Sequence, residues 1–333
     1  MALLNYILSR IGSYLVVLFI GLTITFFLPR LLPSDPIENY IVSLEQQAGQ
    51  TMTPEELESI RETLREIYGL EGSVLQQYVG YLENIVLRFD FGPSLANFPT
   101  PVNRIIMNAL PWTVGLMGVS VIISWLIGNL VGLIAGFFHD THGATVLEVF
   151  GVILYPIPSY IVALVLIMLL GYVWQLFPLS TTIRPGPLTI EKARSILKHS
   201  FLPGFAMIIT RLGWNILSMK AVSFSNKEEA YVTYARLKGT RPMKIMTGYV
   251  ARNSILPQIT RLSLSLGAIF GGAVLVEILF SYPGLGLLMR TAAGTGDYNL
   301  LYGTIVITII SVATAALLID LLYPIFDPRI RYR

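Results

Sequence analysis

The sequence predicts an all-α integral membrane protein with six transmembrane helices. Two observations carry this prediction: the amino-acid composition and the lengths of the apolar runs. Of the 333 residues, 54% are hydrophobic and only 13% are charged, whereas a soluble domain carries about 25% charged residues. Ionisable side chains are unfavourable in lipid, so a chain with a large lipid-facing surface carries few of them. A soluble enzyme of this size is disfavoured, because its surface would still need a charged shell.

The first apolar run covers residues 11–28 and follows Arg10. Its length of about 18 residues is close to what a helix needs to cross the hydrocarbon core. The run is long for the core of a cleaved signal peptide, and it ends at Pro29 and Arg30 without a small-residue cleavage pattern. We therefore expect a retained first transmembrane helix within residues 1–29.

Five further apolar stretches complete the predicted set of six. Four of them are long enough to cross a hydrocarbon core of about 30 Å as helices. The stretch at residues 201–224 is the weakest, because it contains Arg211 and Lys220, and basic side chains reach the interface only from near a helix end. The other four stretches are residues 112–138, 144–174, 262–280 and 303–326.

Six spans place both termini on one side of the membrane, and the basic residues indicate which side. Residues 225–254 hold six lysines and arginines against two glutamates, and the tail, residues 327–333, holds three arginines. The positive-inside rule places both segments in the cytoplasm. One predicted outer loop conflicts with this rule, because four basic residues face a single acidic one there. These residues are Arg184, Lys192, Arg194, Lys198 and Glu191.

Between the first two spans lies a polar segment, residues 30–110, which we expect to form an extracytoplasmic helical cap. Thr53 suits the N-cap of a helix, Pro54 suits its first position, and Glu56 completes a capping box. Gly69 is a suitable stop. The cap either packs on the membrane helices alone or also serves as a platform for a soluble partner. Its apolar positions at helical spacing are Leu57, Ile60, Leu64 and Ile67, and then Val74, Tyr78, Tyr81, Leu82 and Ile85 in a second stretch at residues 73–89.

The motifs of nucleotide binding and of hydrolysis are missing from the sequence. There is no G-x-x-x-x-G-K-[ST] phosphate loop, no H-E-x-x-H zinc motif and no G-x-S-x-G nucleophile motif. The chain has no cysteine, which excludes disulfides and thiolate chemistry. His139 and His142 flank Asp140, but they lack further ligands nearby, so a plain loop is favoured over a metal site. We therefore expect no catalysis, cofactor or metal in this chain.

Two carboxylates, Glu277 and Asp320, fall inside predicted spans, where ionisable groups are often functional. They allow an alternative of another class, a proton-coupled secondary carrier that works alone. Each lies only a few residues from its helix end, about 3 and about 6 residues respectively, at a rise of about 1.5 Å per residue. This shallow depth favours structural or interfacial roles. With Arg211, Lys220 and Arg261, five charges lie within or near the predicted spans.

Glycines recur at every fourth residue in two spans. Small residues at this spacing let helix backbones approach closely in lipid, so we expect a helix-packing role for them. They are Gly128, Gly132 and Gly136 in the second span, and Gly267 and Gly271 in the fifth.

Residues 225–239 predict a compact helix between the fourth and fifth spans. Ser225 or Asn226 can cap its start, and Gly239 suits a left-handed stop. A second short helix can begin at Thr240 and Pro242. A surface helix with aromatic knobs and small gaps suits docking into a groove of another protein; the alternative is a connector that lies on lipid headgroups. The mixed small and aromatic stripe consists of Ala230, Tyr231, Tyr234 and Ala235.

This segment resembles the inner-membrane permease subunits of dipeptide and oligopeptide importers of the ATP-binding-cassette class. The loop signature of that family, Tyr-Val-x-x-Ala-[Arg/Lys]-x-Lys-Gly, is present as Tyr231, Val232, Ala235, Arg236, Lys238 and Gly239. The resemblance covers nearly the whole chain. Further matching segments are residues 32–36, 252–257, 271–280, 282–286 and 327–332, with single matches at Asp90, Gly92, Ser94, Pro111 and Thr113.

The sequence departs from the family at three places. Ser34 and Phe89 stand where the family has glycines, which leaves the details of the outer cap open. The Glu-Ala-Ala triplet of the wider class appears here as residues 233–235, and the peptide-importer branch itself strays from that triplet.

The resemblance implies a multi-pass protein of a prokaryotic inner or plasma membrane, working in a complex. Its partners would be a second permease subunit, two cytoplasmic subunits that bind ATP and Mg²⁺, and an extracytoplasmic substrate-binding protein. Spans two to five would line the path for the cargo, peptides by the resemblance, with oligosaccharides as the alternative. The residues expected to couple to the ATPase are Glu229, Ala230, Tyr231, Thr233, Tyr234, Ala235, Lys238 and Gly239.

Overall fold

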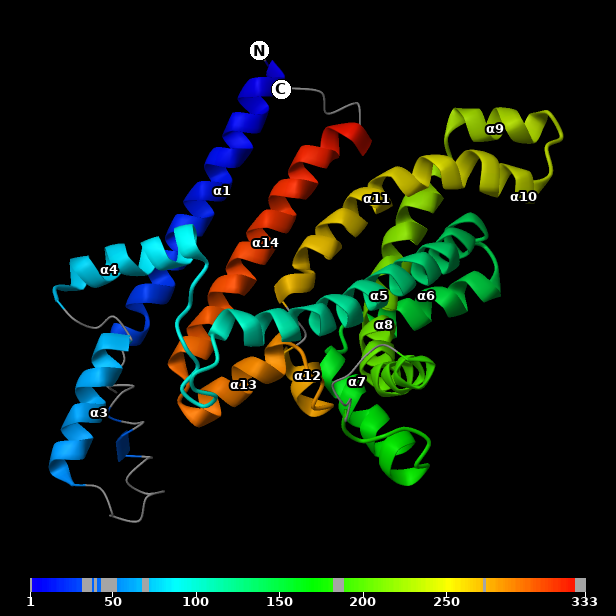
Figure 1. Cartoon of the computed structure of the whole chain (residues 1–333). Helices are drawn as coiled ribbons and strands as arrows, with labels where there is room; N and C mark the ends of the chain where they lie inside the picture. Colours follow the sequence, from blue (N-terminus) through cyan, green and yellow to red (C-terminus); the bar gives the residue numbers. More distant parts are fainter. Residues whose placement is uncertain are drawn as a thin grey trace. The chain divides into compact units, whose positions relative to one another are not determined.

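The computed structural model describes residues 2–31, 38, 41–42, 53–67, 72–181, 189–271 and 274–326. These residues form helices joined by turns, and within them the only β-type pairing is an isolated bridge between Pro93 and Pro101. The all-α prediction is therefore confirmed (Figure 1).

The chain divides into two compact units, each with its own helices. Unit 1 contains Met1–Ile7, Thr113–Tyr282 and Ala315–Arg333, and unit 2 contains Leu8–Trp112 and Pro283–Thr314. The α-helices are α1 (Ala2–Phe27), α3 (Pro54–Ile67), α4 (Val74–Glu83), α5 (Val102–Phe137), α6 (His142–Leu154), α7 (Ser159–Leu166), α8 (Ile190–Lys227), α9 (Ala230–Leu237), α10 (Pro242–Ile245), α11 (Ala251–Gly267), α12 (Val274–Leu279), α13 (Leu285–Thr295) and α14 (Tyr298–Phe326). Three π-helical segments, Asn84–Arg88, Ile167–Val173 and Met246–Val250, and two 3-10 turns, Pro29–Leu31 and Ala268–Gly271, join some of them.

Three helices of the described chain are long and apolar enough to cross a membrane, which makes this a membrane protein. They are Asn5–Phe27, Val102–Phe137 and Tyr298–Leu321. A fourth candidate exists if the pair His142–Leu154 and Ser159–Val173 counts as one span, although its two parts meet at a bend of 97°. The six spans expected from the sequence thus remain a prediction.

Two of the expected spans are broken. Within residues 144–174, Pro156 and Pro158 interrupt the helix, because proline has no amide hydrogen to donate and clashes with the preceding turn. Within residues 262–280, α11 ends at Gly267 and α12 begins at Val274. Glycine is among the poorest helix formers, and several glycines lie in this second interval.

The expected fourth span forms part of the much longer helix α8. Thr189 caps its start, where the threonine hydroxyl accepts a hydrogen bond from Lys192 N at 3.2 Å. The basic positions 192, 194 and 198 therefore lie in the first turns of a helix and not in a loop. Arg184 lies outside the described residues. A helix that the sequence analysis did not anticipate, α13, precedes α14.

In unit 2, the capping box predicted at the start of α3 is present. Thr53 N donates to Glu56 Oε2 at 2.7 Å, and Glu56 N donates to Thr53 Oγ1 at 3.3 Å. The predicted apolar face is also present, because Leu64 packs with Ile41 and Leu95, flanked by the partly buried Leu57 and Ile60. Gly69 and the side chain of Ile67 lie outside the described residues.

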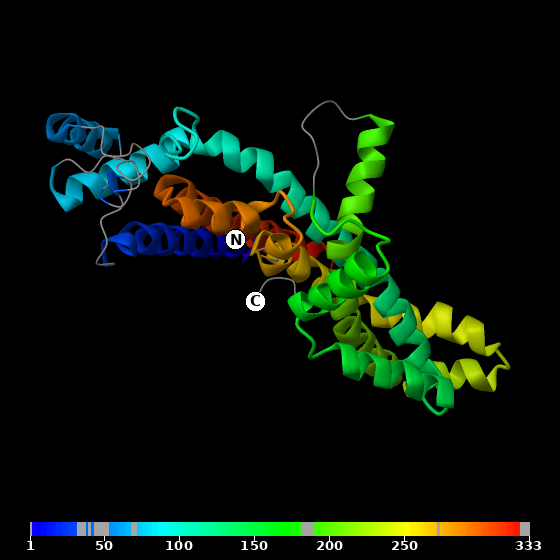
Figure 2. The ribbon, with the colours of Figure 1, turned by 90° about the horizontal axis from the view of Figure 1, so that it is seen from below.

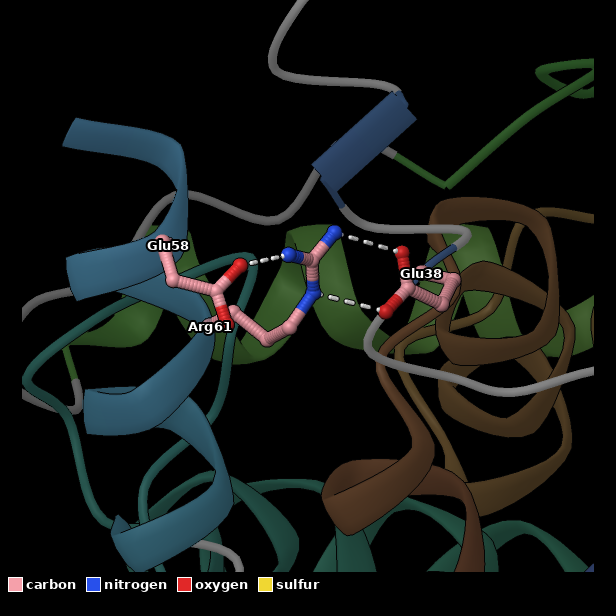
Figure 3. A network of polar contacts seen from close by, with 3 residues as sticks. All are labelled: Glu38, Glu58 and Arg61. Atoms are coloured by element: carbon pink, nitrogen blue, oxygen red, sulfur yellow. Dashed lines mark hydrogen bonds and ion pairs between the residues drawn. The ribbon is translucent and has the colours of Figure 1, made fainter. Parts of the chain in front are cut away.

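An ion cluster holds α3 to the segment before it (Figure 3). The guanidinium of Arg61 donates to both carboxylate oxygens of Glu38, at 2.8 and 3.0 Å, and also binds Glu58 one turn away. Such bidentate pairs fix geometry as well as charge. All three side chains keep substantial contact with solvent.

The second stretch predicted in the cap forms α4 and the π-helical turn after it. Ser73 and Gln76 form a capping box at its start. Of the expected apolar positions, Ile85 is buried with Leu22 and Val306, and Tyr81 and Leu82 pack against them, whereas Val74 is 52% exposed. The segment ends at Phe89, whose φ of 52° lies in the left-handed region that favours glycine.

A buried carboxylate, Asp297, organises the end of this region. Its oxygens accept from the hydroxyl of Ser94 and from the backbone amides of Ala96, at 3.2 Å, and Leu300, at 3.1 Å. Residues 102–110, which the sequence analysis assigned to the cap, belong to α5 and pack against α13 and α14 through Val102, Ile106 and Leu285. Within unit 2, α1 and α14 also lie side by side, and Gly21 is in close contact with Ile309 (Figure 1).

Candidate functional site

The turn between α8 and α9 differs from the sequence expectation. Ser225 and Asn226 do not cap a new helix, because α8 continues to Lys227 and both residues lie in its last turn. The Asn226 side chain instead donates to Ser254 Oγ at 2.9 Å. The residue before α9 is Glu229, which has extended backbone angles and makes no side-chain cap.

The inner face of α9 is buried against the ends of several unit 1 helices. Val232 and Ala235 are 0% and 2% exposed. They belong to a cluster that joins α9 to α5, α8 and α10 and to the π-helical turn before α11. This α9 cluster contains Leu133, Phe137, Met219, Val232, Ala235, Ile245, Met246 and Val250, with Tyr231 packed at its edge. The expected small gap at Ala235 is therefore wrong as a surface feature, because the residue packs inside its own chain.

The outward face of α9 carries apolar and aromatic side chains that no described part of the chain covers. Leu237 is 82% exposed and Tyr234 is 60% exposed, and Ala230 and Thr233 are exposed beside them. Lys238 lies over the Tyr234 ring, with its Nζ 4.8 Å from the ring centroid, within range of a cation–π contact. Exposed large apolar side chains beside a polar rim suit an interaction with another protein. Of the expected stripe, Ala230 and Tyr234 point outward and Tyr231 is half-buried.

The end of α9 follows the sequence prediction closely. Gly239 has a φ of +74°, and its N–H donates to Arg236 O at 2.9 Å. This left-handed stop is the one that glycine provides without a steric penalty. The second short helix, α10, begins at Pro242, with Arg241 in the N-cap position in place of the expected Thr240. Both views show α9 and α10 side by side near the end of α8 (Figures 1 and 2).

A polar cluster fixes the end of α8 to the turn between α5 and α6. Lys227 Nζ lies 2.9 Å from His139 Nδ1 and 3.5 Å from Asp140 Oδ2, and His139 Nε2 lies 2.8 Å from Asp140 Oδ1. In the described part of the chain, no group of three or more His, Asp or Glu could hold a metal ion. His139 therefore acts here as a partner for Lys227, and α9 starts from a fixed base.

The three glycines of α5 lie directly against α8. A Cβ added at Gly132 would be 2.5 Å from Ile216 O, and one at Gly136 would be 2.5 Å from Lys220 O. At Gly128 the nearest atom would be the Cβ of Asn215, at 2.4 Å. This is the close backbone approach that the four-residue spacing predicts. It ties the α9 cluster to a rigid helix pair.

Of the other two predicted packing glycines, Gly267 is in tight contact with a neighbouring helix, whereas no contact of Gly271 is described. A Cβ at Gly267 would meet Ile319 of α14 at 3.0 Å, which is a tight contact inside unit 1. Gly271 closes the 3-10 turn before α12, and its packing lies outside the described contacts. A closer approach that the spacing pattern does not predict occurs at Gly213, where a Cβ would be 2.5 Å from Tyr155 N at the end of α6. Gly213 has no partner at four-residue spacing, so the packing pattern could not find it.

The buried carboxylate Glu277 serves as an anchor. It is 0% exposed and accepts a hydrogen bond from Thr113 Oγ1 at 2.7 Å. Thr113 is itself fully buried on α5. This enclosed and hydrogen-bonded position agrees with the structural role expected for Glu277 and disagrees with the interfacial one.

Comparison with known proteins covers nearly the whole chain. Residues 128–332 match the family described as binding-protein-dependent transport system inner membrane component, and residues 3–117 match the N-terminal part of such membrane components. The oligopeptide transport system permease protein AppB of Bacillus subtilis is 30% identical over 98% of this chain and 99% of its own length. The dipeptide transport system permease proteins DppB of Bacillus subtilis and Lactococcus lactis are 26% and 25% identical, over 98% and 99% of this chain and 98% and 100% of their own lengths. The chain belongs to the family of inner-membrane components of binding-protein-dependent transport systems.

Proposed function

We propose that this chain is the membrane-spanning permease subunit of an ATP-binding-cassette importer for peptides. The relatives that match it from end to end are named as oligopeptide and dipeptide permeases. Among the described residues, the observation that supports this role best is α9, a short helix with a buried inner face and an exposed outer face. In this proposal α9 docks on a separate cytoplasmic ATPase subunit.

The proposed coupling works through the packing beneath α9. ATP binding closes the ATPase pair and moves the docked helix. Because Val232 and Ala235 are embedded among side chains of α5, α8 and the α10 region, α9 cannot move without these elements. The motion therefore reaches the helices that line the cargo path and switches access from one face of the membrane to the other.

We propose six spans, with both termini in the cytoplasm. These would be α1, α5, the bent pair α6–α7, α8, the broken pair α11–α12, and α14. Breaks in a span are tolerated in lipid where neighbouring protein satisfies the freed backbone groups. The basic segment at residues 225–254 would then lie beside the ATPase, and the α3–α4 segment would lie on the outer face, toward the binding protein. A second permease subunit would complete the path.

Copurification tests the assembly. The tagged chain is purified in mild detergent, and its companions are identified by mass spectrometry. We expect two ATPase subunits, a second permease of similar length and a binding protein, whose bound cargo then distinguishes peptides from oligosaccharides. Recovery of the chain alone, under conditions that preserve other such complexes, would favour a carrier driven by a proton gradient.

A pair of substitutions tests the docking face. Leu237→Glu places a charge on the exposed face of α9, and Leu197→Glu places the same charge at a site of similar exposure, 73%, on α8. Losing an apolar anchor at an interface commonly costs more than about 1.4 kcal/mol, which is tenfold in binding. We expect Leu237→Glu to reduce ATP-driven uptake and ATPase copurification at least about tenfold, with Leu197→Glu near wild type. Equal effects of the two variants would contradict the docking role of α9.

A further inference from the structure

Helices α8 and α11 run past one another in unit 1 with polar and charged side chains along their contact. Ser218 Oγ donates to Gln258 Oε1 at 3.1 Å. One turn further along both helices, the guanidinium carbon of Arg261 lies 5.6 Å from the centroid of the Trp214 ring. Arg211 shares the α8 face of Trp214 and Ser218, because residues spaced by three and seven positions lie on one side of a helix. The row therefore continues to Arg211.

Neither arginine in this row has a carboxylate partner among the described residues. Arg211 and Arg261 are partly buried, and no ion pair to either is found within residues 189–271 or the other described segments. By contrast, Lys220 on the same helix pairs with Glu148. An unpaired cation within a membrane-spanning region is costly and marks a path or a binding site.

Three buried polar atoms beside this row also lack partners within the described chain. They are Arg261 Nη1, Gln258 Nε2 and Asn129 Oδ1, and Gln258 and Asn129 are only 1% and 4% exposed. Trp125 links two of these residues: its Nε1 donates to Gln258 O at 2.9 Å, and its carbonyl accepts from Asn129 Nδ2 at 2.7 Å. Buried donors left without partners are destabilising, so a ligand that accepts from them would be bound favourably.

One side of the row is open. Trp214 is 49% exposed, although one of its faces stacks on Tyr155 with the ring centroids 5.3 Å apart. The close approach of Gly213 to the backbone of Tyr155 holds this part of α8 in place. A fixed and exposed indole beside the Arg261 guanidinium offers an apolar surface and positive charge at the same site.

We propose that Arg211, Arg261 and Gln258 form a subsite for the terminal carboxylate of the peptide as it passes through the importer. The inference rests on the proposed peptide-import function and adds a recognition element within the permease itself. Arginine donors match a carboxylate geometrically. Within the described chain, two buried donors at this place, Arg261 Nη1 and Gln258 Nε2, lack partners, against one acceptor, Asn129 Oδ1. An anionic group therefore fits better than the ammonium end of a peptide. Trp214 would contact the side chain of the last residue.

The test uses the whole importer reconstituted in liposomes and two labelled cargos, trialanine and trialanine amide. The binding protein is saturated with each peptide in turn, so that its own selectivity cancels. We expect Arg261→Gln to lower ATP-driven uptake of trialanine about tenfold and to leave uptake of the amide unchanged, since a charge-assisted hydrogen bond is lost. Arg261→Lys should recover part of the difference. Arg211→Gln should act in the same direction, and Arg194→Gln, at an exposed position of α8, should change neither rate.

Each result has a defined meaning. A fall in the ratio of acid to amide uptake, with the complex intact, supports the subsite. An equal fall for both cargos, together with loss of the second permease from the complex, would overturn it, because the arginines would then bind a carboxylate of the partner subunit. Unchanged uptake of both cargos would also overturn it. If the wild-type importer showed no ATP-driven uptake of trialanine, the proposed function itself would fail, and the subsite with it.

Discussion

The α9–α10 segment and the α3–α4 segment use the same local signals but are held in different ways. Both contain short helices with a capping residue or proline at the start of a helix and a left-handed residue at a stop. The α9–α10 segment buries Val232 and Ala235 in a cluster formed with α5, α8 and the π-helical turn before α11. Among the side chains of α3 that the structure describes, only Leu64 is buried, against Ile41 and Leu95, and α3 also relies on ion pairs near solvent such as Arg61–Glu38.

This difference indicates how each segment responds to force. Close-packed side chains transmit displacement, since they have few voids to absorb it. Exposed ion pairs are worth little and exchange readily with water. A helix that couples two proteins needs the first kind of support. A cap that only covers the membrane helices can use the second.

The largest loss of stability is expected at Gly132, where α5 and α8 meet beneath the α9 cluster. Gly132→Ala puts a Cβ within 2.5 Å of Ile216 O, so α5 and α8 must separate. We expect a loss of about 3 kcal/mol in the free energy of unfolding, in line with overpacked interiors. Gly115→Ala on the same helix is the control, because no described atom beyond the neighbouring turns of α5 lies within 4 Å of the added Cβ. Thermal unfolding of the purified complex measures both, and equal melting temperatures would refute the close packing.

A smaller effect is expected inside α9 itself. Val232→Ala removes two buried methyl groups from a fully enclosed position, and we expect a loss of about 2 kcal/mol. Thr233→Ala, at the exposed neighbour, should change stability by no more than about 0.5 kcal/mol. The effects of both substitutions are measured as the protease resistance of the α8–α11 region in the absence of ATPase subunits. If Thr233→Ala opened the region as much as Val232→Ala, the inner and outer faces would be assigned incorrectly.

In the α4 region a substitution should stabilise the protein. Phe89 has a φ of 52°, where a side chain is strained, so Phe89→Gly should raise the free energy of unfolding by about 1 kcal/mol. The ring contact with Phe91, at 5.3 Å between centroids, is lost and offsets part of this gain. Arg88→Gly, one residue earlier within the π-helical turn, should instead destabilise by about 1 kcal/mol. Destabilisation by both variants would show that the Phe89 ring matters more than its backbone.

The smallest effect concerns pH and the ion cluster of α3. The hydrogen bonds from Arg61 lower the pKa of the Glu38 carboxyl below its ordinary value. The resulting stabilisation is fully present above the pKa of the unfolded chain and is lost as the pH falls through the lowered value in the folded chain. We expect a slight acid-side weakening of α3 docking, followed by hydrogen exchange between about pH 6 and about pH 3. Arg61→Gln should remove this pH dependence, and its persistence in that variant would assign it to another carboxylate.

Local signals in the sequence predicted the ends of several helices. Thr53 and Glu56 form their capping box, and Gly239 stops α9, because each depends only on neighbouring backbone groups. The glycines of α5 also lie as their spacing predicts, against α8. The family signature around residues 231–239 was enough to locate the candidate docking segment.

What the sequence could not predict depends on distant contacts. Ser225 and Asn226 have the side chains of capping residues, but α8 continues past both to Lys227. The Asn226 side chain instead donates a hydrogen bond to Ser254 of α11. Both faces of α9 carry small and aromatic residues, so its periodicity could not show that Ala235 faces inward. The sequence did not predict the break after Gly267, because the residues on both sides of it are apolar and together have the length of one span. The sequence could not single out Gln258 and Asn129, because an isolated amide side chain in an apolar helix belongs to no repeating pattern.

The length of α8 has a mechanical consequence. Its 38 residues extend about 57 Å at 1.5 Å per residue, well beyond a hydrocarbon core of about 30 Å. From Gly204, which lies against Ser120 and Leu116 of α5, to the first residue at Ile190 is a rod of about 21 Å. A tilt of about 10° around that fulcrum would sweep the tip by about 4 Å, the width of a side chain. The helix thus acts as a lever, in which a small rotation about its contact with α5 at Gly204 displaces the Ile190 end by about one side-chain width.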